Sequence, residues 1–158
     1  RKSAKYLESA LDTFGGDDEG NKSMRQMTRA LLVQAYESYG KTDMATEHCV
    51  AIGRETPYSP DQDYQPLFRL APTYPLNMLS RGKTGHVDLE FTIDETGFVR
   101  DPSVIDRTVD GKQRSSSNAF DEAALEAVGR FRYAPRFEDG VAVPVAGVKT
   151  RISFELVD

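Results

Sequence analysis

The sequence predicts an α+β protein in which a helical first third precedes a small antiparallel three-stranded sheet packed with helices, in the order β-β-α-β. Residues 1–57 show only the three- and four-residue spacing of apolar positions that is typical of helices. Residues 86–93 and 146–156 alternate apolar and polar side chains, which indicates strands with one buried face. Between these strands, residues 118–132 carry an apolar stripe at helical spacing, so we expect a helix to cover the sheet.

Composition and charge narrow the classes of function. The chain has 158 residues and a formal net charge of −5, and neither half is basic, so we expect no nucleic-acid partner. No apolar run approaches the roughly 20 residues needed to cross a bilayer. The single cysteine, Cys49, allows no internal disulfide. Because the sequence begins at Arg1 rather than Met, we expect a membrane anchor or leader to precede it in the full protein.

Three helices are expected in residues 1–57. Apolar residues recur at helical spacing over Lys2–Phe14, Met24–Tyr39 and 43–55. Gly40 ends the second helix, and Pro57 ends the third. The apolar side of the second helix comprises Met24, Met27, Leu31, Ala35 and Tyr39.

The second and third helices resemble one tetratricopeptide repeat, a helix–turn–helix unit of 34 residues. The positions that match the repeat are Leu32, Tyr36, Gly40, Ala45, Ile52 and Pro57. One repeat and a preceding helix are fewer than the roughly three units that such arrays need for stability. We therefore expect further repeats upstream and a protein partner for this region.

Residues 58–72 are expected to form an extended connector between a helical domain, 1–57, and a second domain, 73–158. The connector is rich in proline, which disfavours helices and interior strands. Its apolar residues are too numerous for a free linker, so they are expected to pack along the second domain. These residues are Leu67, Phe68 and Leu70.

The second domain should begin with a short helix at 75–82 and a β-hairpin. The hairpin joins a strand at 86–93 to a return strand at 98–105 through the turn 94–97, where Gly97 can adopt a positive φ. Pro102 predicts an edge position or a bulge in the return strand. The polar residues that follow are expected to form a loop up to residue 118.

The best helix of the chain follows that loop. Asn118 is expected to cap it, and its apolar stripe runs from Phe120 to Phe131. Arg130 and Arg132 suit the carboxyl end of this helix, where the helix dipole is negative.

The final strand begins at Gly147 and alternates through Leu156, so it is expected at a sheet edge with unpaired backbone groups. An open edge is an aggregation hazard, but it is also a docking surface for an extended peptide. We interpret the strand as peptide-binding, although an ordinary paired strand fits the same pattern. Lys149 and Arg151 fit either contacts to a partner or charges that prevent aggregation.

The sequence carries no recognisable catalytic or metal-binding motif. No serine or cysteine lies in a nucleophile motif with a partner base, and the Gly-rich run lacks the residues of a phosphate loop. His48 and His86 lie in different predicted domains without a Cys–His pattern, and Cys49 fits a core position. We therefore expect a protein that is not an enzyme and that binds no metal and no cofactor.

Four segments, in this order, resemble the carboxyl-terminal domain of TonB. They are YP at 74–75, GHVDLEFTIDETGFVRDPSVI at 85–105, AALEAVGRFRYAP at 123–135 and VKTRISFEL at 148–156. Each segment alone is a common strand or helix pattern, whereas the four segments in this order are specific to the TonB carboxyl-terminal domain. The likeness covers residues 70–158.

This resemblance implies a bacterial energy transducer anchored in the inner membrane, where a proton-driven ExbB–ExbD motor acts on it. In that family the carboxyl-terminal domain crosses the periplasm to outer-membrane transporters for siderophores, cobalamin and similar ligands. There it binds the TonB box, a short extended segment of the transporter, through its last strand and through the segment around the YP pair. Mapped onto this chain, the partner-binding residues are Ala71, Pro72, Thr73, Tyr74, Pro75, Val148, Lys149, Thr150, Arg151, Ile152, Ser153 and Phe154.

Two differences from the family leave an alternative open. Residues 71–73 lack the glutamine that known members carry there, and helices stand where the family has a long Pro-rich spacer. A passive periplasmic adaptor, in which repeats and sheet domain gather proteins, is therefore the second hypothesis. A homodimer formed by strand exchange is also compatible with an open edge.

Overall fold

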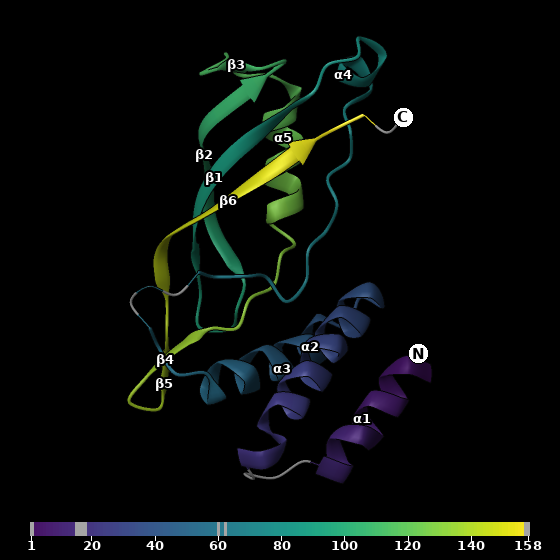
Figure 1. The fold of residues 1–158 in the computed structure, drawn as a ribbon, viewed down its shortest axis with the longest axis vertical. Helices are drawn as coiled ribbons and strands as arrows, with labels where there is room; N and C mark the ends of the chain where they lie inside the picture. Colours follow the sequence, from purple (N-terminus) through teal and green to yellow (C-terminus); the bar gives the residue numbers. More distant parts are fainter. Residues whose placement is uncertain (1, 15–18, 60, 62, 157–158) are drawn as a thin grey trace.

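The structure, a computed structural model, describes most of the chain, namely residues 2–14, 19–59, 61 and 63–156. Three helices gather at one end, and a twisted sheet with one helix on its face forms the other end (Figure 1). We call residues 2–56 the helical region and residues 73–156 the sheet region. The predicted α+β class is confirmed.

The helical region contains its three helices where the sequence predicts them. They are α1 (Lys2–Phe14), α2 (Lys22–Ser38) and α3 (Thr42–Glu55), with a short 3₁₀ turn, η1 (Glu19–Asn21), before α2. Gly40 makes the turn between α2 and α3 with a φ of 74°. Ala45 and Cys49 of α3 are fully buried in the same core as Leu32 and Val33 of α2. The small side chain of Ala45 lets the two helices approach closely.

The predicted apolar side of α2 is wrong. Met24, Met27 and Leu31 are 54%, 67% and 44% exposed, and Tyr39 is also exposed. The buried side of α2 instead carries Leu32, Val33 and Tyr36, along with Arg25 and Thr28. Helix α2 thus has two apolar stripes, and the packing partner α3, rather than the spacing alone, decides which one is covered.

The sheet region contains the three long strands that the sequence predicts, and short strands that it does not. The main sheet is antiparallel in the order β3-β2-β1-β6, with β1 (Gly85–Ile93), β2 (Val99–Val109), β3 (Lys112–Gln113) and β6 (Val145–Phe154). A separate ribbon pairs β4 (Arg136–Glu138) with β5 (Val141–Val143). Helix α4 (Leu76–Ser80) precedes β1, and helix α5 (Ala119–Val128) lies on one face of the sheet.

Two strand boundaries differ from the sequence prediction. Strand β2 runs on to Val109, and β3 follows it, so part of the expected polar loop is paired strand. Strand β6 begins at Val145, and Gly147, with a φ of 73°, forms a bulge within it. The bulge predicted at Pro102 is present, because the register of β1 and β2 shifts there and Asp101 has a φ of 52°.

A core between α5 and the sheet fixes the inner face of β6. Asn118 caps α5 as predicted, since its side-chain oxygen accepts a hydrogen bond of 2.8 Å from the Phe120 amide. Phe120 stacks on Phe154 of β6 with ring centroids 4.3 Å apart. Each large side chain buried in this way contributes about 1.5–3 kcal/mol. The core comprises Met78, Val87, Leu89, Phe91, Ile93, Val99, Phe120, Ala124, Val128, Phe131, Tyr133, Val148, Ile152 and Phe154.

Arg132 lies between the two regions and not at the end of α5, where the sequence analysis placed it. It is 1% exposed, and its guanidinium lies 3.8 Å from the centroid of the Phe98 ring. One terminal nitrogen donates to Thr46 Oγ1 and to the Thr96 carbonyl at 2.8 and 2.9 Å, and the other lies 3.4 Å from Glu37 Oε1. A single side chain therefore joins α2, α3 and the β1–β2 turn.

The connector packs against this junction. The amides of Leu67 and Phe68 donate to the Arg132 carbonyl, and the Arg132 amide donates to the Phe68 carbonyl at 3.0 Å. The side chains of Leu67 and Phe68 pack against the core of the helical region, and Leu70 is exposed. The expected packing along the second domain therefore holds for the backbone of Leu67 and Phe68, which pairs with Arg132, and not for these side chains. Buried peptide groups need hydrogen-bond partners, and the N–H and C=O of Arg132 supply them to Leu67 and Phe68.

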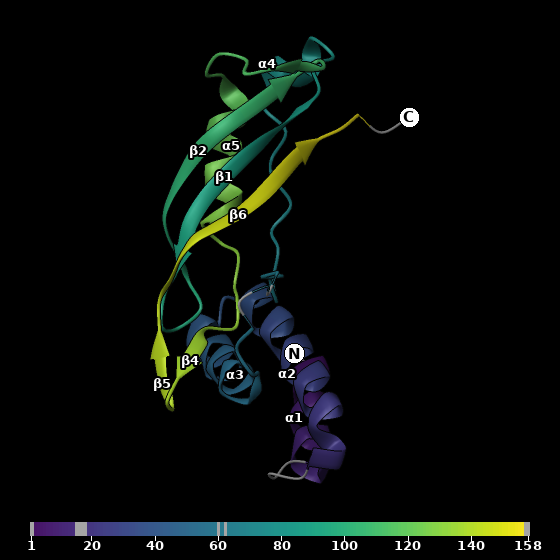
Figure 2. The same ribbon diagram turned by 60° about the vertical axis from the view of Figure 1, so that its left-hand side comes forward.

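The ribbon β4–β5 reaches from the sheet region to α3, as Figures 1 and 2 both show. A Cβ atom added to Gly53 of α3 would lie 2.2 Å from the Pro135 carbonyl oxygen, so only glycine allows this close approach. Beside it, the guanidinium of Arg54 lies 5.3 Å from the centroid of Phe137 on β4. The two regions therefore share a packed contact.

Candidate functional site at a free sheet edge

Strand β6 lies at an edge of the main sheet. It pairs with β1 on one flank, and from Val148 to Phe154 this pairing runs without a register shift. Within the described part of the chain, no strand pairs with the other flank, and the backbone hydrogen bonds of the connector go to Arg132 instead. In an antiparallel pair every second residue directs its N–H and C=O away from its neighbour. The outer flank of residues 148–154, which we call the β6 edge, thus offers backbone donors and acceptors.

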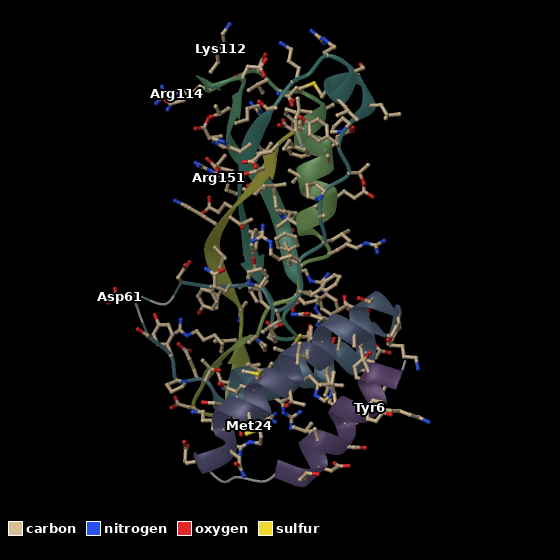
Figure 3. All side chains as sticks on the ribbon, turned by 45° about the vertical axis from the view of Figure 1, so that its right-hand side comes forward. Tyr6, Met24, Asp61, Lys112, Arg114 and Arg151 are labelled. Atoms are coloured by element: carbon tan, nitrogen blue, oxygen red, sulfur yellow. The ribbon has the colours of Figure 1, made fainter. Side chains whose placement is uncertain are left out.

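Side chains divide cleanly between the two faces of β6. Val148, Ile152 and Phe154 are buried under α5, at 7%, 1% and 2% exposure. Lys149 and Arg151 alternate with them and lie exposed on the opposite face, as the view of Arg151 in Figure 3 shows. The predicted alternation is confirmed, because the core holds one face while the other remains in solvent.

The outer face of β6 carries two cations in different environments. Arg151 donates to both carboxylate oxygens of Asp88 on β1, at 2.8 and 3.3 Å. These hydrogen bonds raise the pKa of Arg151. Lys149 lies opposite Glu90 in the ladder, but its ammonium forms no salt bridge with any described residue.

The opposite edge, along β2, is closed in several ways. Pro102 has no backbone N–H, and two register shifts interrupt the pairing of β2 with β1. Strand β3 covers its last residues, Thr108 and Val109. At its beginning, Phe98 forms a β-bridge with Arg132. Bulges, proline and covering segments are the devices by which natural sheets block further strands.

The second predicted contact segment, residues 71–75, lies beside the end of β6. Tyr74 packs edge-on against both Phe120 and Phe154, with ring centroids 5.7 Å apart in each case. Its hydroxyl donates to the Lys83 carbonyl, and burial raises its pKa. Pro75 caps α4, and Ala71 and Thr73 are exposed. Tyr74 therefore supports the fold, while its exposed neighbours remain open to a partner.

The structure brings these predicted residues together only at one end of β6, through the contact of Tyr74 with Phe154. Two features of the site were not predicted from the sequence: Asp88, which orients Arg151, and the bulge at Gly147, after which the uninterrupted stretch begins. The alternation of β1 places Asp88 on the solvent face, but the sequence did not show that β1 pairs with β6 and so brings Asp88 opposite Arg151.

Two further features are absent from the part of the chain that the structure describes. No group of three or more His, Cys, Asp or Glu side chains there is arranged to hold a metal ion. No helix in that part of the chain has both the length and the apolar character needed to cross a membrane.

Comparison with known proteins identifies the family. The model of the family described as "Gram-negative bacterial TonB protein C-terminal" matches residues 71–156, more than half of the chain. The chain belongs to the TonB C-terminal family. This is a transport-associated family and not a family of enzymes. The matched residues include β6 and the segment around Tyr74, whereas the model covers none of the residues before 71.

Solved TonB domains resemble the chain. The solution structure of the Pseudomonas aeruginosa TonB carboxyl-terminal domain has 27% identity and a TM-score of 0.48, over 63% of this chain and 92% of that one. The TonB2 protein from Vibrio anguillarum has 31% identity and a TM-score of 0.44, over 65% and 91%. Among curated proteins, none matches the chain. The predicted resemblance to TonB is confirmed by the family match, and the likeness of α2–α3 to a tetratricopeptide repeat stays a prediction.

Proposed function

We propose that this chain is the periplasmic part of a TonB-like energy transducer, and that the β6 edge binds the extended TonB box of an outer-membrane transporter. The observation that carries the proposal is the sheet order, which leaves the outer flank of residues 148–154 without a paired strand among the described residues. Addition of a guest strand to an open edge is a recurrent mode of peptide recognition. Exposed Ala71 and Thr73, near the end of β6, would form the second contact.

The proposed binding is weak at equilibrium and strong against a directed pull. A docked strand makes several backbone hydrogen bonds, each worth about 0.5–1.5 kcal/mol net. Pulled along the strand, these bonds carry the load together, whereas a perpendicular pull loads them one after another. Single-molecule pulling of a bound peptide in the two directions tests this: a higher rupture force along the strand is expected, and equal forces would contradict it.

The force would originate outside this chain. In the proposed assembly, an amino-terminal anchor holds the full protein in the inner membrane, and an ExbB–ExbD-type motor uses the proton gradient to act on it. The transported ligands would be siderophores, cobalamin or similar scarce compounds. Membership in the TonB C-terminal family supports this assembly and a periplasmic location.

Titration of the chain with extended peptides from the amino ends of candidate transporters tests the proposal. NMR shift changes are expected for amides of residues 147–155 and 71–75, and for few others. Absence of binding by every peptide, with the spectrum of the folded chain intact, would overturn the proposal.

A second candidate function is that of a passive periplasmic adaptor. The observation that favours it is an exposed apolar stripe formed by Met24, Met27 and Leu31 of α2 and by Tyr39 just after it. Tyr6 on α1 is exposed as well, and Figure 3 labels it together with Met24. Exposed apolar patches mark protein-binding surfaces. Ligand uptake by cells that lack their own transducer and express the full protein separates the two: uptake that requires the proton gradient supports the transducer, and the adaptor restores none.

A further inference from the structure

We propose that the segment bound at the β6 edge is acidic, with carboxylate side chains at alternate positions that contact Lys149 and Arg151. This inference rests on the proposed strand addition and specifies the chemistry of the partner. The observation behind it is a pair of exposed cations on one face of an unpaired edge strand.

The geometry of a sheet brings a guest's side chains onto these two cations. Lys149 and Arg151 are two residues apart on the same face, so their Cα atoms lie roughly 6.6 Å apart along the strand. A paired guest strand directs every second side chain to that face, about 4.5–5.5 Å from its cross-strand neighbour at the Cβ atoms. Carboxylates spaced by one intervening residue would therefore meet both cations.

Both cations retain hydrogen-bonding capacity for such a guest. Lys149 has no salt bridge within the described residues, although Glu90 lies opposite it on β1. Arg151 uses its Nε and one terminal nitrogen for Asp88. A guanidinium has five N–H donors, so three remain for a further acceptor.

Strand β2, the long strand near the other edge of the sheet, lacks this property. Arg100 at the beginning of β2 binds Asp94 within its own hairpin at 2.7 Å. Arg107, further along β2, forms two hydrogen bonds of 2.8 Å with Asp121 of α5. Both arginines are thus neutralised by carboxylates of the same chain. Arg151 is paired with Asp88 in the same way, so on the two long edge strands the cation without an ion pair among the described residues is Lys149 of β6, where the outer backbone flank is also unpaired.

The charge of the whole chain makes this arrangement selective. The formal net charge is −5, so the chain as a whole repels acidic segments weakly. Along residues 148–154 the charged side chains of β6 are the two cations, whereas Glu155 lies just beyond them and the carboxylates of Asp88 and Glu90 lie one strand further in. A basic guest would meet like charges directly across the new strand pair, which is unfavourable.

The same two cations also fit a purely protective role, in which they prevent aggregation of edge strands. The two roles differ in what a change of sign does. A protective charge works with either sign, whereas a contact to a carboxylate does not.

Two synthetic peptides of identical length test the proposal: one alternates valine with aspartate, and its control alternates valine with asparagine. Titration into the native chain, followed by NMR shifts of the β6 amides, should show tighter binding of the acidic peptide by about two- to fivefold per carboxylate–cation pair. Added salt should reduce this preference, because the pairs are exposed.

Charge reversal provides the matched variants. Lys149→Glu should abolish or invert the preference and favour a peptide with lysine in place of aspartate. Lys112→Glu makes the same change of charge on exposed β3, far from Arg151 in Figure 3, and should leave the preference unchanged. Dispersed amide spectra establish that both variants fold.

The outcomes separate this inference from the proposed function. Equal binding of the aspartate and asparagine peptides would overturn the acidic partner and leave strand addition standing. An equal effect of Lys149→Glu and Lys112→Glu would assign the preference to overall charge and would also overturn it. Failure of both peptides to bind would overturn strand addition itself.

Discussion

Strand β2 is interrupted by Pro102 and two bulges, covered at its end by β3 and bridged at its start by Arg132. Strand β6, at the other edge of the same sheet, presents residues 148–154 in one uninterrupted ladder. Both edges belong to one fold and one core, so stability does not require one to be irregular and the other regular. The difference shows that a sheet edge is blocked by local features, here a proline, bulges and covering segments. Residues 148–154 of β6 lack these features, so this is the edge on which a partner strand can add.

The largest predicted effect concerns the closed end of β2. Arg132→Met removes the hydrogen bonds to Thr46, Thr96 and Glu37 and leaves the Glu37 carboxylate, in a side chain only 10% exposed, without its cation. Breaking a buried ion pair by removing one partner costs about 3–5 kcal/mol. Urea denaturation should show a loss of that order in the free energy of unfolding.

Arg130→Met, two residues away and exposed, serves as the control and should change stability by less than about 0.5 kcal/mol. Equal losses in the two variants would mean that the Arg132 junction contributes nothing special. Peptide binding at the β6 edge should persist in the folded fraction of both variants.

The next effect concerns the support of β6. Tyr74→Ala removes a half-buried ring from its contacts with Phe120 and Phe154, so a loss of about 2 kcal/mol in unfolding free energy is expected. Tyr74→Phe keeps the ring and loses only the hydroxyl bond to the Lys83 carbonyl, which is worth about 1 kcal/mol. If Tyr74→Ala left thermal stability unchanged and weakened peptide binding alone, the residue would be a partner contact and not a support.

A third prediction uses the helical region, which lies on neither edge. His48 Nδ1 lies 2.9 Å from an Arg29 guanidinium nitrogen and can only accept there, so the ring is neutral and its Nε2–H donates to Glu8. Burial lowers the pKa of His48; the hydrogen bond and charge of Glu8 and the charge of Glu47 oppose this shift, and the charge of Arg29 adds to it.

Because the folded-state pKa lies below the unfolded value of about 6.5, the unfolded chain binds more protons in acid. The stabilisation is full above pH 6.5 and is lost as the pH falls through that value toward the folded pKa, with a slope of at most about 1.4 kcal/mol per pH unit. Urea midpoints of the native chain and of His48→Gln should converge as the pH falls. If the urea midpoints of the two proteins differed by the same amount at every pH, His48 would not be the source of the pH dependence.

The smallest predicted effect tests whether proline alone closes β2. Pro102→Ala restores one backbone N–H but leaves the bulge, in which Asp101 has a φ of 52°. The stability should change by less than about 0.5 kcal/mol, and NMR titration should show no peptide binding along residues 99–107. Peptide-induced shift changes along β2 would contradict this account, because they would show that the bulges alone do not prevent strand addition.

Much of the fold was predictable where the pattern is long and local. The alternation of β1 and β6, the stripe and cap of α5 and the positive φ of Gly97 (86°) are all present as expected. The short strands were missed, although Asp110–Gly111 and Asp139–Gly140 offered a signal. Both pairs have positive φ at both residues and make the tight turns of β2–β3 and β4–β5, for which Asp-Gly is a strong hairpin sequence.

The junction at Arg132 had no comparable local signal. Its side-chain partners are 36 to 95 residues away in sequence, so charge and spacing alone pointed to the helix end that lies next to it. For the same reason the covered side of α2 could not be chosen from its two apolar stripes. The edge position of β6 was expected because it is the final strand, predicted to begin at a glycine and to run to Leu156. The irregularities that close β2 emerged only from the pairing register.

Hydrogen exchange at the β6 edge tests the central claim most directly. In the free chain, every second amide of residues 148–154 should exchange quickly, because it points away from β1. Addition of an extended transporter peptide should slow those same amides and leave the β2 amides unchanged. Slow exchange along all of 148–154 before any peptide is added, or protection that appears on β2 instead, would contradict the account.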